Sequence, residues 1–159
     1  MLKTINTVGI SLALLASAFS FSAMAQDKLT VGVDTAFVPF EFKQGDKYVG
    51  FDIDLWNAIA KKMGVEYTLQ PMDFSGLIPG LQSRNIDVAM AGITITPVRA
   101  QAVDFSDPYY NADLLMAVKS SATGINKFSD LAGKKVGLKQ GTAAATYMKA
   151  HVKADYVEF

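Results

Sequence analysis

Apolar side chains recur along the chain with two different periods, and together they predict short strands that alternate with helices. Residues 29–33 are apolar at alternate positions and contain β-branched side chains, which predicts a strand. From Asp52 onward the apolar side chains fall on one helical stripe, and Gly64 follows as a helix stop signal. The members of this stripe are Trp56, Ile59, Ala60 and Met63. A helix is therefore expected to follow the first strand, after a loop that Pro39 forces.

The following segments continue the alternation. Strands are predicted over 65–69 and 86–90, with a helix over 74–83 between them. The order strand, helix, strand, helix, strand is typical of the α/β fold class, in which helices cover a parallel sheet. Ligands of such sheets bind outside the carboxyl ends of the strands. The loops that follow the predicted strands are therefore the places to search for a binding site.

A second unit with the same pattern is predicted in the last third of the sequence. Its strands are expected over 109–118, 134–138 and 156–159, and its helix from Gly141 to about Val152. The last strand reaches the end of the given sequence without a turn or a cap. Because a terminal strand needs neighbours to pair with, we expect the sequence to be a fragment of a longer chain.

The first 25 residues have the pattern of a secretory signal peptide. Lys3 gives a positive start, residues 8–21 form an apolar run interrupted only by glycine and serine, and Ala23-Met24-Ala25 is a small-x-small cleavage site. The run is too short and too rich in Ala and Ser to be a typical transmembrane anchor. We expect cleavage after Ala25. Because no cysteine at the junction can carry a lipid anchor, the product is expected to be soluble outside the inner membrane.

Composition removes several functional classes. The chain has 159 residues with 15 basic and 15 acidic side chains, so it has no net charge that would attract a nucleic acid. It contains no cysteine and a single histidine, which excludes disulfides, thiolate zinc sites and histidine clusters. The glycine-rich phosphate loop and the sequence motifs of hydrolases and metalloproteases are also absent. We therefore expect neither a metal nor a cofactor.

Several positions in the predicted loops have side chains suited to binding a ligand. Arg99 follows a strand end, and a guanidinium can bind a carboxylate through two parallel hydrogen bonds, although a surface arginine is the alternative. Asp34 ends the first strand, either as a ligand contact or as a turn residue. Phe37 and Phe74 also follow strand ends, although core packing is the default for phenylalanine. Gly141-Thr142-Ala143 opens a helix whose free N–H groups can bind an anion.

Other polar residues receive a structural interpretation. Asp52 and Asp54 stand at the start of a predicted helix, where carboxylates cap free N–H groups. Asp104 and Asp107 flank a short loop and are interpreted as turn residues. His151 lies near the end of the last predicted helix, where a positive charge is favourable. None of these five residues is expected to take part in catalysis or metal binding.

Five motifs occur in an order that resembles a known family. They are 34–42 (DTAFVPFEF), 50–55 (GFDIDL), 72–81 (MDFSGLIPGL), 91–99 (AGITITPVR) and 104–110 (DFSDPYY). From Leu29 to its end, the chain is similar to the polar amino-acid-binding proteins of bacterial ABC importers. The resemblance implies a monomeric periplasmic protein that is not an enzyme. Its ligand would be L-glutamine or a related polar amino acid, and its partner an inner-membrane ABC permease.

The resemblance also implies a periplasmic-binding-protein-like fold of two α/β lobes joined by a hinge. Residues 26–108 would form the N-terminal part of the first lobe, 109–113 the first hinge strand and 114–159 an incomplete second lobe. The acidic residue that holds the ligand's ammonium group would lie beyond this sequence, so the given chain is expected to bind or fold poorly. A periplasmic dehydratase of the same fold and a ligand-sensing receptor domain stay open as alternatives.

Within the cleft between the lobes, the resemblance assigns the ligand's backbone to one group of residues. Arg99 would bind the α-carboxylate, in agreement with the geometry of its guanidinium. The backbone of Ala91 and Gly92, together with the hydroxyl of Thr94, would bind the remaining atoms of the α-carboxylate and the α-ammonium group.

A second group would meet the ligand's side chain. Phe37 and Phe74 would pack on its two sides, and Asp34 would accept a hydrogen bond from the amide of glutamine while repelling the carboxylate of glutamate. From the second lobe, Lys139 and the turn at Gly141-Thr142-Ala143 would close over the ligand. Ala143 stands where related proteins tend to have glycine, so a positive φ at this residue would strain the chain.

Overall fold

The computed structural model describes residues 28–159, and the predicted signal peptide over residues 1–25 lies outside them. Strand β1 (Leu29–Val33) is the centre of a parallel sheet, between β5 (Tyr67–Pro71) and β6 (Val88–Ala89). The predicted α/β order and the parallel sheet are confirmed, although β5 begins at Tyr67 instead of residue 65 and β6 is shorter than expected.

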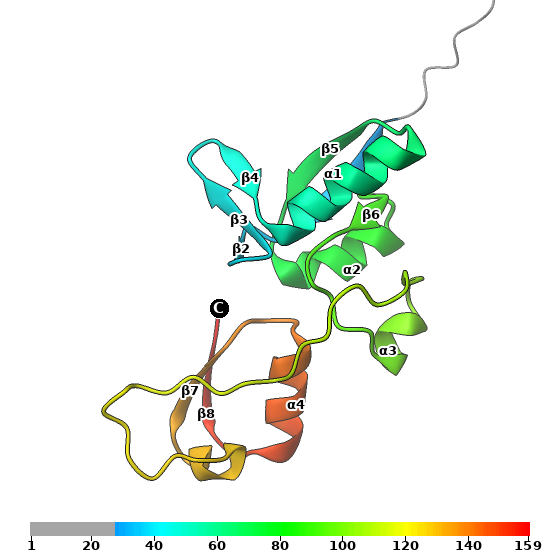
Figure 1. Cartoon of the computed structure of the whole chain (residues 1–159). Coiled ribbons are helices and arrows are strands. Elements are labelled where there is room, and N and C mark those ends of the chain that lie inside the picture. Colours follow the sequence, from blue (N-terminus) through cyan, green and yellow to red (C-terminus); the bar gives the residue numbers. More distant parts are fainter. Residues whose placement is uncertain (1–27) are drawn as a thin grey trace, which may run out of the picture.

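Helices α1 (Phe51–Met63) and α2 (Phe74–Gln82) cover opposite faces of this sheet (Figure 1). Alternate residues of β1 explain the arrangement, because Val31 and Val33 belong to the cluster that α1 completes, whereas Gly32 faces α2. A Cβ atom on Gly32 would lie 3.0 Å from Cδ2 of Leu77. The absence of a side chain at this position therefore lets α2 pack directly on the central strand.

Glycines fix both ends of α1. Gly50 is the N-cap with a φ of 127°, and a Cβ atom there would lie 2.2 Å from the carbonyl oxygen of Phe40. Gly64 ends the helix in the left-handed conformation, as predicted. The predicted apolar stripe is wrong at its last member, since Met63 is 61% exposed. Ile53, one turn before Trp56, is buried and takes part in the core instead.

A three-stranded antiparallel sheet, which contains a β-hairpin and was not predicted from the sequence, lies between β1 and α1. Its strands are β2 (Ala36–Phe37), β3 (Glu41–Gln44) and β4 (Lys47–Val49), which pair antiparallel. Few of its side chains are buried, so no hydrophobic alternation marks the strands in the sequence. The hairpin places the first residue of β3 in the interior of the protein.

A smaller second unit consists of the 3-10 helix η1 (Phe128–Leu131), β7 (Lys135–Leu138), α4 (Ala143–His151) and β8 (Asp155–Glu158). Strands β7 and β8 pair in parallel, and α4 packs on them through Ala145 and Met148. The strands predicted over 134–138 and 156–159 and the helix predicted between them are confirmed within one or two residues. We call the elements β1 to α3 the N-terminal unit and η1 to β8 the C-terminal unit.

The segment between the two units starts after the short helix α3 (Pro97–Ala100) and runs to η1 (Figure 1). The long strand predicted over 109–118 is wrong, because this segment pairs with no strand of the described chain. An extended segment forms a strand only where a neighbour supplies backbone hydrogen bonds.

Candidate functional site

The carboxyl ends of β1 and β6 bring three of the predicted site residues to one edge of the sheet. Asp34 directly follows β1 and is only 5% exposed, whereas Ala91 and Gly92 follow β6. Gly92 has a φ of 52°, and a Cβ atom there would lie 2.8 Å from Cε1 of Phe37. Both the conformation and the close aromatic ring therefore require glycine at this position.

The backbone of Gly92 is held by a carboxylate from α1. Its N–H donates to Oδ2 of Asp52 at 2.8 Å and to the hydroxyl oxygen of Tyr109 at 3.2 Å. The Tyr109 hydroxyl in turn donates to the same Asp52 oxygen at 2.9 Å. The capping role predicted for Asp52 is therefore wrong, since its carboxylate is fully buried and binds groups far along the chain. Burial, followed by the charge of Asp52, raises the pKa of Tyr109, so its hydroxyl stays a donor.

Arg99 lies on α3, whose start is fixed locally. Thr96 is the N-cap, and its hydroxyl oxygen accepts from the Arg99 N–H at 3.3 Å. The guanidinium donates through Nη1 to the carbonyl oxygen of Thr94 at 2.7 Å, and its carbon lies 5.5 Å from the ring centre of Phe74. Burial lowers the pKa of Arg99, although an arginine keeps its charge at neutral pH. In this contact Thr94 uses its backbone carbonyl oxygen, and the contact expected between its hydroxyl and a ligand stays a prediction.

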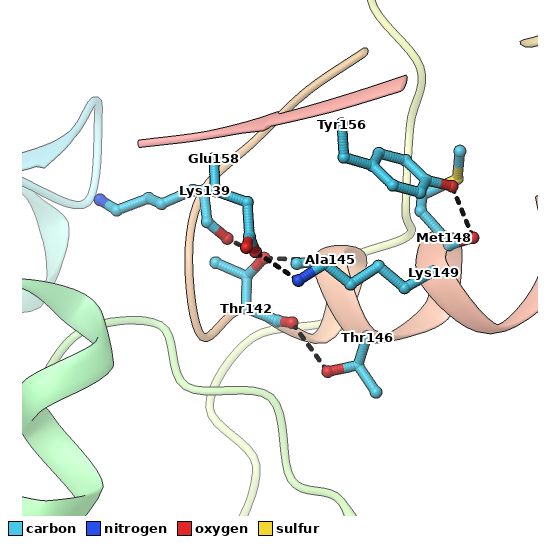
Figure 2. Close-up of polar contacts among 8 residues, drawn as sticks. All are labelled: Lys139, Thr142, Ala145, Thr146, Met148, Lys149, Tyr156 and Glu158. Carbon is cyan, nitrogen blue, oxygen red and sulfur yellow. Dashed lines mark hydrogen bonds and ion pairs between the residues drawn. The ribbon is translucent and has the colours of Figure 1, made fainter. Parts of the chain in front are cut away.

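Two polar contacts join the units at this edge. Nη2 of Arg99 donates to the carbonyl oxygen of Gly141 at 2.8 Å, and the ammonium group of Lys139 forms an ion pair with Oδ2 of Asp34. The other oxygen of Asp34 accepts from the N–H of Ala36 at 3.2 Å. Figure 2 shows the Lys139 side chain pointing away from α4, towards the N-terminal unit. Residues predicted from both units are therefore brought together.

The turn before α4 is built to approach the N-terminal unit. Thr142 caps the helix, because its hydroxyl oxygen accepts from the N–H of Ala145 at 3.1 Å and the hydroxyl donates to the carbonyl of Lys139 at 2.8 Å (Figure 2). Gly141 has a φ of 77°, and a Cβ atom there would lie 3.0 Å from Cα of Ser75. Ala143 is the first helical residue and has no positive φ. The strain considered for Ala143 is therefore absent, and Gly141 carries the special conformation.

The two predicted aromatic residues lie in different surroundings. The ring of Phe37 is 41% exposed and stacks on Phe40 with 4.9 Å between ring centres. Phe74 is half-buried beneath Arg99. Phe40 also contacts the ring of Tyr110 at 4.8 Å, which links the hairpin to the segment between the units. Neither phenylalanine belongs to the fully buried core, so both stay candidates for contact with a ligand.

An open cavity of about 800 Å³ adjoins this edge and extends along β6 towards α1. Among the predicted site residues it is lined by Phe37, Ala91, Gly92 and Thr94. Asp34, Arg99 and Lys139 do not line it, because they face the contact between the units. The predicted residues are thus divided between a cavity and the adjoining polar contact.

Sequence reasoning missed one buried acidic residue near the site. Glu41, the first residue of β3, is fully buried, and neither of its carboxyl oxygens has a hydrogen-bond partner among the described residues. Burial is the largest cause that raises its pKa to about 9, and the neighbouring Asp52 adds to the effect. The signal in the sequence that could have identified Glu41 was its position between Phe40 and Phe42 in the motif 34–42.

The other polar residues considered lie away from this edge. Asp54, Asp104 and Asp107 are exposed, and His151 is exposed at the end of α4 with Nδ1 at 2.7 Å from the carbonyl oxygen of Tyr147. Within residues 28–159 there is no group of three potential metal ligands. That same part of the chain contains no helix long and apolar enough to cross a membrane.

Comparison with known proteins identifies the family. Residues 29–157 match the model of the bacterial extracellular solute-binding proteins, family 3. The arginine-binding extracellular protein ArtP of Bacillus subtilis (strain 168) is 44% identical over 126 residues, which are 79% of this chain and 49% of that protein. The chain therefore spans about half the length of the curated relatives that it matches.

Solved structures agree with this assignment. An ancestral arginine-binding protein bound to glutamine has a TM-score of 0.76 and 48% identity, covering 82% of this chain and 60% of that one. An ancestral amino acid-binding protein that is a precursor of cyclohexadienyl dehydratase has a TM-score of 0.77 and 41% identity, covering 83% and 60%. The mixed α/β fold is thus the periplasmic-binding-protein-like fold predicted from the sequence.

Proposed function

Because the chain belongs to family 3 of the bacterial extracellular solute-binding proteins, we propose that it binds L-glutamine for an ABC importer. It would act in the periplasm, after removal of residues 1–25, and deliver the amino acid to an inner-membrane permease. The observation that carries the choice of ligand is the ion pair of Asp34 and Lys139 beside Arg99. Named relatives bind arginine, and one related ancestral structure holds glutamine.

The ion pair favours a neutral amide over a charged side chain. A primary amide has donors and an acceptor in one planar group, so its NH₂ can donate to Asp34 while its oxygen accepts from Lys139. Glutamate would bring a second negative charge against Asp34, and arginine would bring a second positive charge against Lys139. Insertion of the glutamine amide between the two residues therefore satisfies both charges without adding a third.

Arg99 is the residue expected to bind the α-carboxylate of the ligand. Both terminal nitrogens of the guanidinium are used by backbone carbonyls, one from Thr94 and one from Gly141. A carboxylate is a stronger acceptor than a carbonyl and fits the guanidinium with two parallel hydrogen bonds. We expect the ligand to replace the Gly141 carbonyl, so that Arg99 changes from a contact between the units to a contact with the ligand.

Ligand binding and the approach of the units are coupled in this arrangement. Asp34 and Arg99 belong to the N-terminal unit, whereas Lys139 and the Gly141 turn belong to the C-terminal unit. A ligand that contacts all four stabilises the state in which the units are close, and the permease would recognise that state. The expected mechanism is a two-state closure without any bond made or broken.

Ligand-dependent stability tests this proposal. The melting temperature of the mature protein is measured with glutamine, glutamate, arginine and histidine in turn, because a ligand that binds only the folded state raises it. Glutamine is expected to give the largest increase and glutamate none. A larger increase with arginine than with glutamine would overturn the choice of ligand and leave the family unchanged.

The similarity to a precursor of cyclohexadienyl dehydratase favours a second candidate, an enzyme of the same fold. Catalysis would need a general acid or base that reaches the ligand. Asp34 is the acidic residue at the edge of the cleft, and it is already paired with Lys139. Mass spectrometry of candidate cyclohexadienyl substrates incubated with the protein distinguishes the two functions, since a binding protein leaves them unchanged.

A further inference from the structure

Two buried carboxyl groups come from neighbouring backbone segments beneath the candidate site, since the N–H of Asp52 donates to the carbonyl oxygen of Phe40 at 2.9 Å, directly before Glu41. Glu41 comes from β3 and Asp52 from α1, and both side chains are fully buried. Oδ2 of Asp52 accepts from the Gly92 N–H and from the Tyr109 hydroxyl. The other Asp52 oxygen and both oxygens of Glu41 have no partner among residues 28–159. Three buried acceptors without donors are a rare arrangement that calls for a physical explanation.

A single proton accounts for two of these three oxygens. Two adjacent buried carboxyl groups do not both ionise, and a protonated carboxyl group becomes a hydrogen-bond donor. The unpartnered oxygen of Asp52 is an available acceptor for it. Asp52 already accepts two hydrogen bonds, which stabilise its anion, whereas Glu41 accepts none. The proton therefore belongs on Glu41 and the negative charge on Asp52.

The pKa of Glu41 agrees with this assignment. Burial raises it first and the charge of Asp52 second, to about 9, with a smaller contribution from Asp34 in the same direction. Lys139 opposes the shift from the C-terminal unit. Tyr109, from the segment between the units, supplies a neutral hydroxyl to the pair. These groups come from the elements around Glu41, and acidic neighbours outnumber the single basic one.

We propose that Glu41 is a positioning residue, which carries a proton at neutral pH and shares it with Asp52, so that Asp52 holds the Gly92 N–H and Tyr109 in place. The pair fixes the loop after β6 at the edge of the cleft and ties it to the segment between the units. Loss of the proton would place two negative charges in the interior and weaken both anchors. The inference concerns the geometry of the N-terminal unit and does not depend on which amino acid is bound.

Carbon-13 NMR of the carboxyl groups tests the proposal directly. The chain contains three glutamates, Glu41, Glu66 and Glu158, so labelled glutamate gives three signals that single Glu→Gln variants assign. In the folded chain we expect the signal of Glu41 to titrate near pH 9. The backbone amide signal of Gly92 is expected to move with the midpoint of Glu41. Titration of Glu41 near its ordinary pKa of 4.5 in a folded chain would overturn the proposal.

Two isosteric variants distinguish two explanations for the raised pKa of Glu41: a proton shared with Asp52, and burial alone. In Asp52→Asn the amide oxygen can accept from Gly92 and the NH₂ can donate to an ionised Glu41, so the midpoint of Glu41 should fall by more than one pH unit. An unchanged midpoint would show that burial alone raises it and would refute the sharing. Glu41→Gln keeps a donor towards Asp52, so the Gly92 amide signal should keep its neutral-pH position and lose its movement near pH 9.

The second variant tests whether Glu41 carries the proton even if Asp52→Asn does not fold. The folded chain binds the Glu41 proton more tightly than the unfolded chain, so stability is expected to fall as the pH rises from about 4.5 to about 9. Glu41→Gln should remove this fall, whereas the control Glu66→Gln, at an exposed position, should retain it. A Glu41→Gln variant with the same pH dependence as the parent would contradict the proposal.

Discussion

The two units contribute to the cleft in different ways. In the N-terminal unit the groups at the edge are anchored from behind, since Gly92 is held by the buried Asp52 and Asp34 follows the fully buried end of β1. In the C-terminal unit Lys139 keeps 27% of its side chain exposed and lies on a turn that Thr142 holds locally. The groups of the N-terminal unit are therefore held by buried neighbours, whereas the C-terminal unit contributes a partly exposed charge.

The largest expected effect comes from a substitution that disturbs the fixed geometry of the N-terminal unit. Gly50→Ala places a Cβ atom against the carbonyl oxygen of Phe40 at a residue whose φ of 127° already excludes other side chains. We expect a loss of about 4 kcal/mol in the free energy of unfolding, because neither backbone segment can move without disturbing α1. Denaturation in urea measures it.

Gly45→Ala is the matched control for this substitution. Gly45 also has a positive φ, of 61°, but nothing lies within 4 Å of the position of its Cβ atom. Its expected cost is about 1 kcal/mol from conformation alone. Equal costs for the two variants would show that the contact with Phe40 is not a constraint on the start of α1.

The next largest effect is on ligand binding. Arg99→Ala leaves the α-carboxylate of the ligand buried without a cation, so glutamine affinity should fall by about 3 kcal/mol, more than a hundredfold. Isothermal titration calorimetry measures the change. Arg84→Ala replaces the other arginine of the chain, which lies exposed after α2, and should bind as the parent does. Parent-like affinity of Arg99→Ala would remove Arg99 from the site.

Local pattern predicted the elements that carry a clear hydrophobic period and missed those that do not. The strand at Leu29–Val33 and the helices α1, α2 and α4 follow from apolar spacing and from stop signals such as Gly64. The hairpin of β2, β3 and β4 has mostly exposed side chains, so its order comes from the turn at Gly45 and from packing on α1. The segment over 109–118 shows the opposite error: it was predicted as a strand, but it has no partner strand in the described chain.

The role of the buried polar residue Asp52 could not be predicted from the sequence. A carboxylate in the first turn of a helix is usually a cap, and Asp52 was interpreted as one. Its real partners lie 40 and 57 positions further along the chain, at Gly92 and Tyr109. Asp34 and Arg99 were easier to identify, because the carboxyl end of a parallel strand is itself a sign of a ligand site. Their roles towards a ligand stay predictions.

A smaller effect is expected from a substitution in the C-terminal unit. Lys139→Met removes the positive charge that faces Asp34 and keeps much of the side chain's length. Without it the cleft gains a net negative charge, so glutamine affinity should fall by about 1–2 kcal/mol while arginine affinity rises. Competition calorimetry with the two amino acids gives the ratio directly.

Lys149→Met is the control for charge alone, because Lys149 pairs with Glu158 on the exposed side of α4 and β8. It should leave the preference between glutamine and arginine unchanged. A shift of the same size in both variants would mean that overall charge, and not the ion pair with Asp34, sets the preference.

The smallest expected effect concerns the turn that carries Lys139. Thr142→Val keeps the shape of the side chain but removes the hydroxyl that caps α4 and binds the carbonyl of Lys139. We expect the free energy of unfolding to fall by about 1 kcal/mol, and glutamine affinity to fall only slightly, because Lys139 stays tethered by β7. Thr146→Val, one turn later on the exposed side of α4, should change neither quantity measurably. If Thr142→Val weakened binding as strongly as Lys139→Met, the turn itself would set the geometry of the site, and the division between a fixed N-terminal side and an adjustable C-terminal side would not hold.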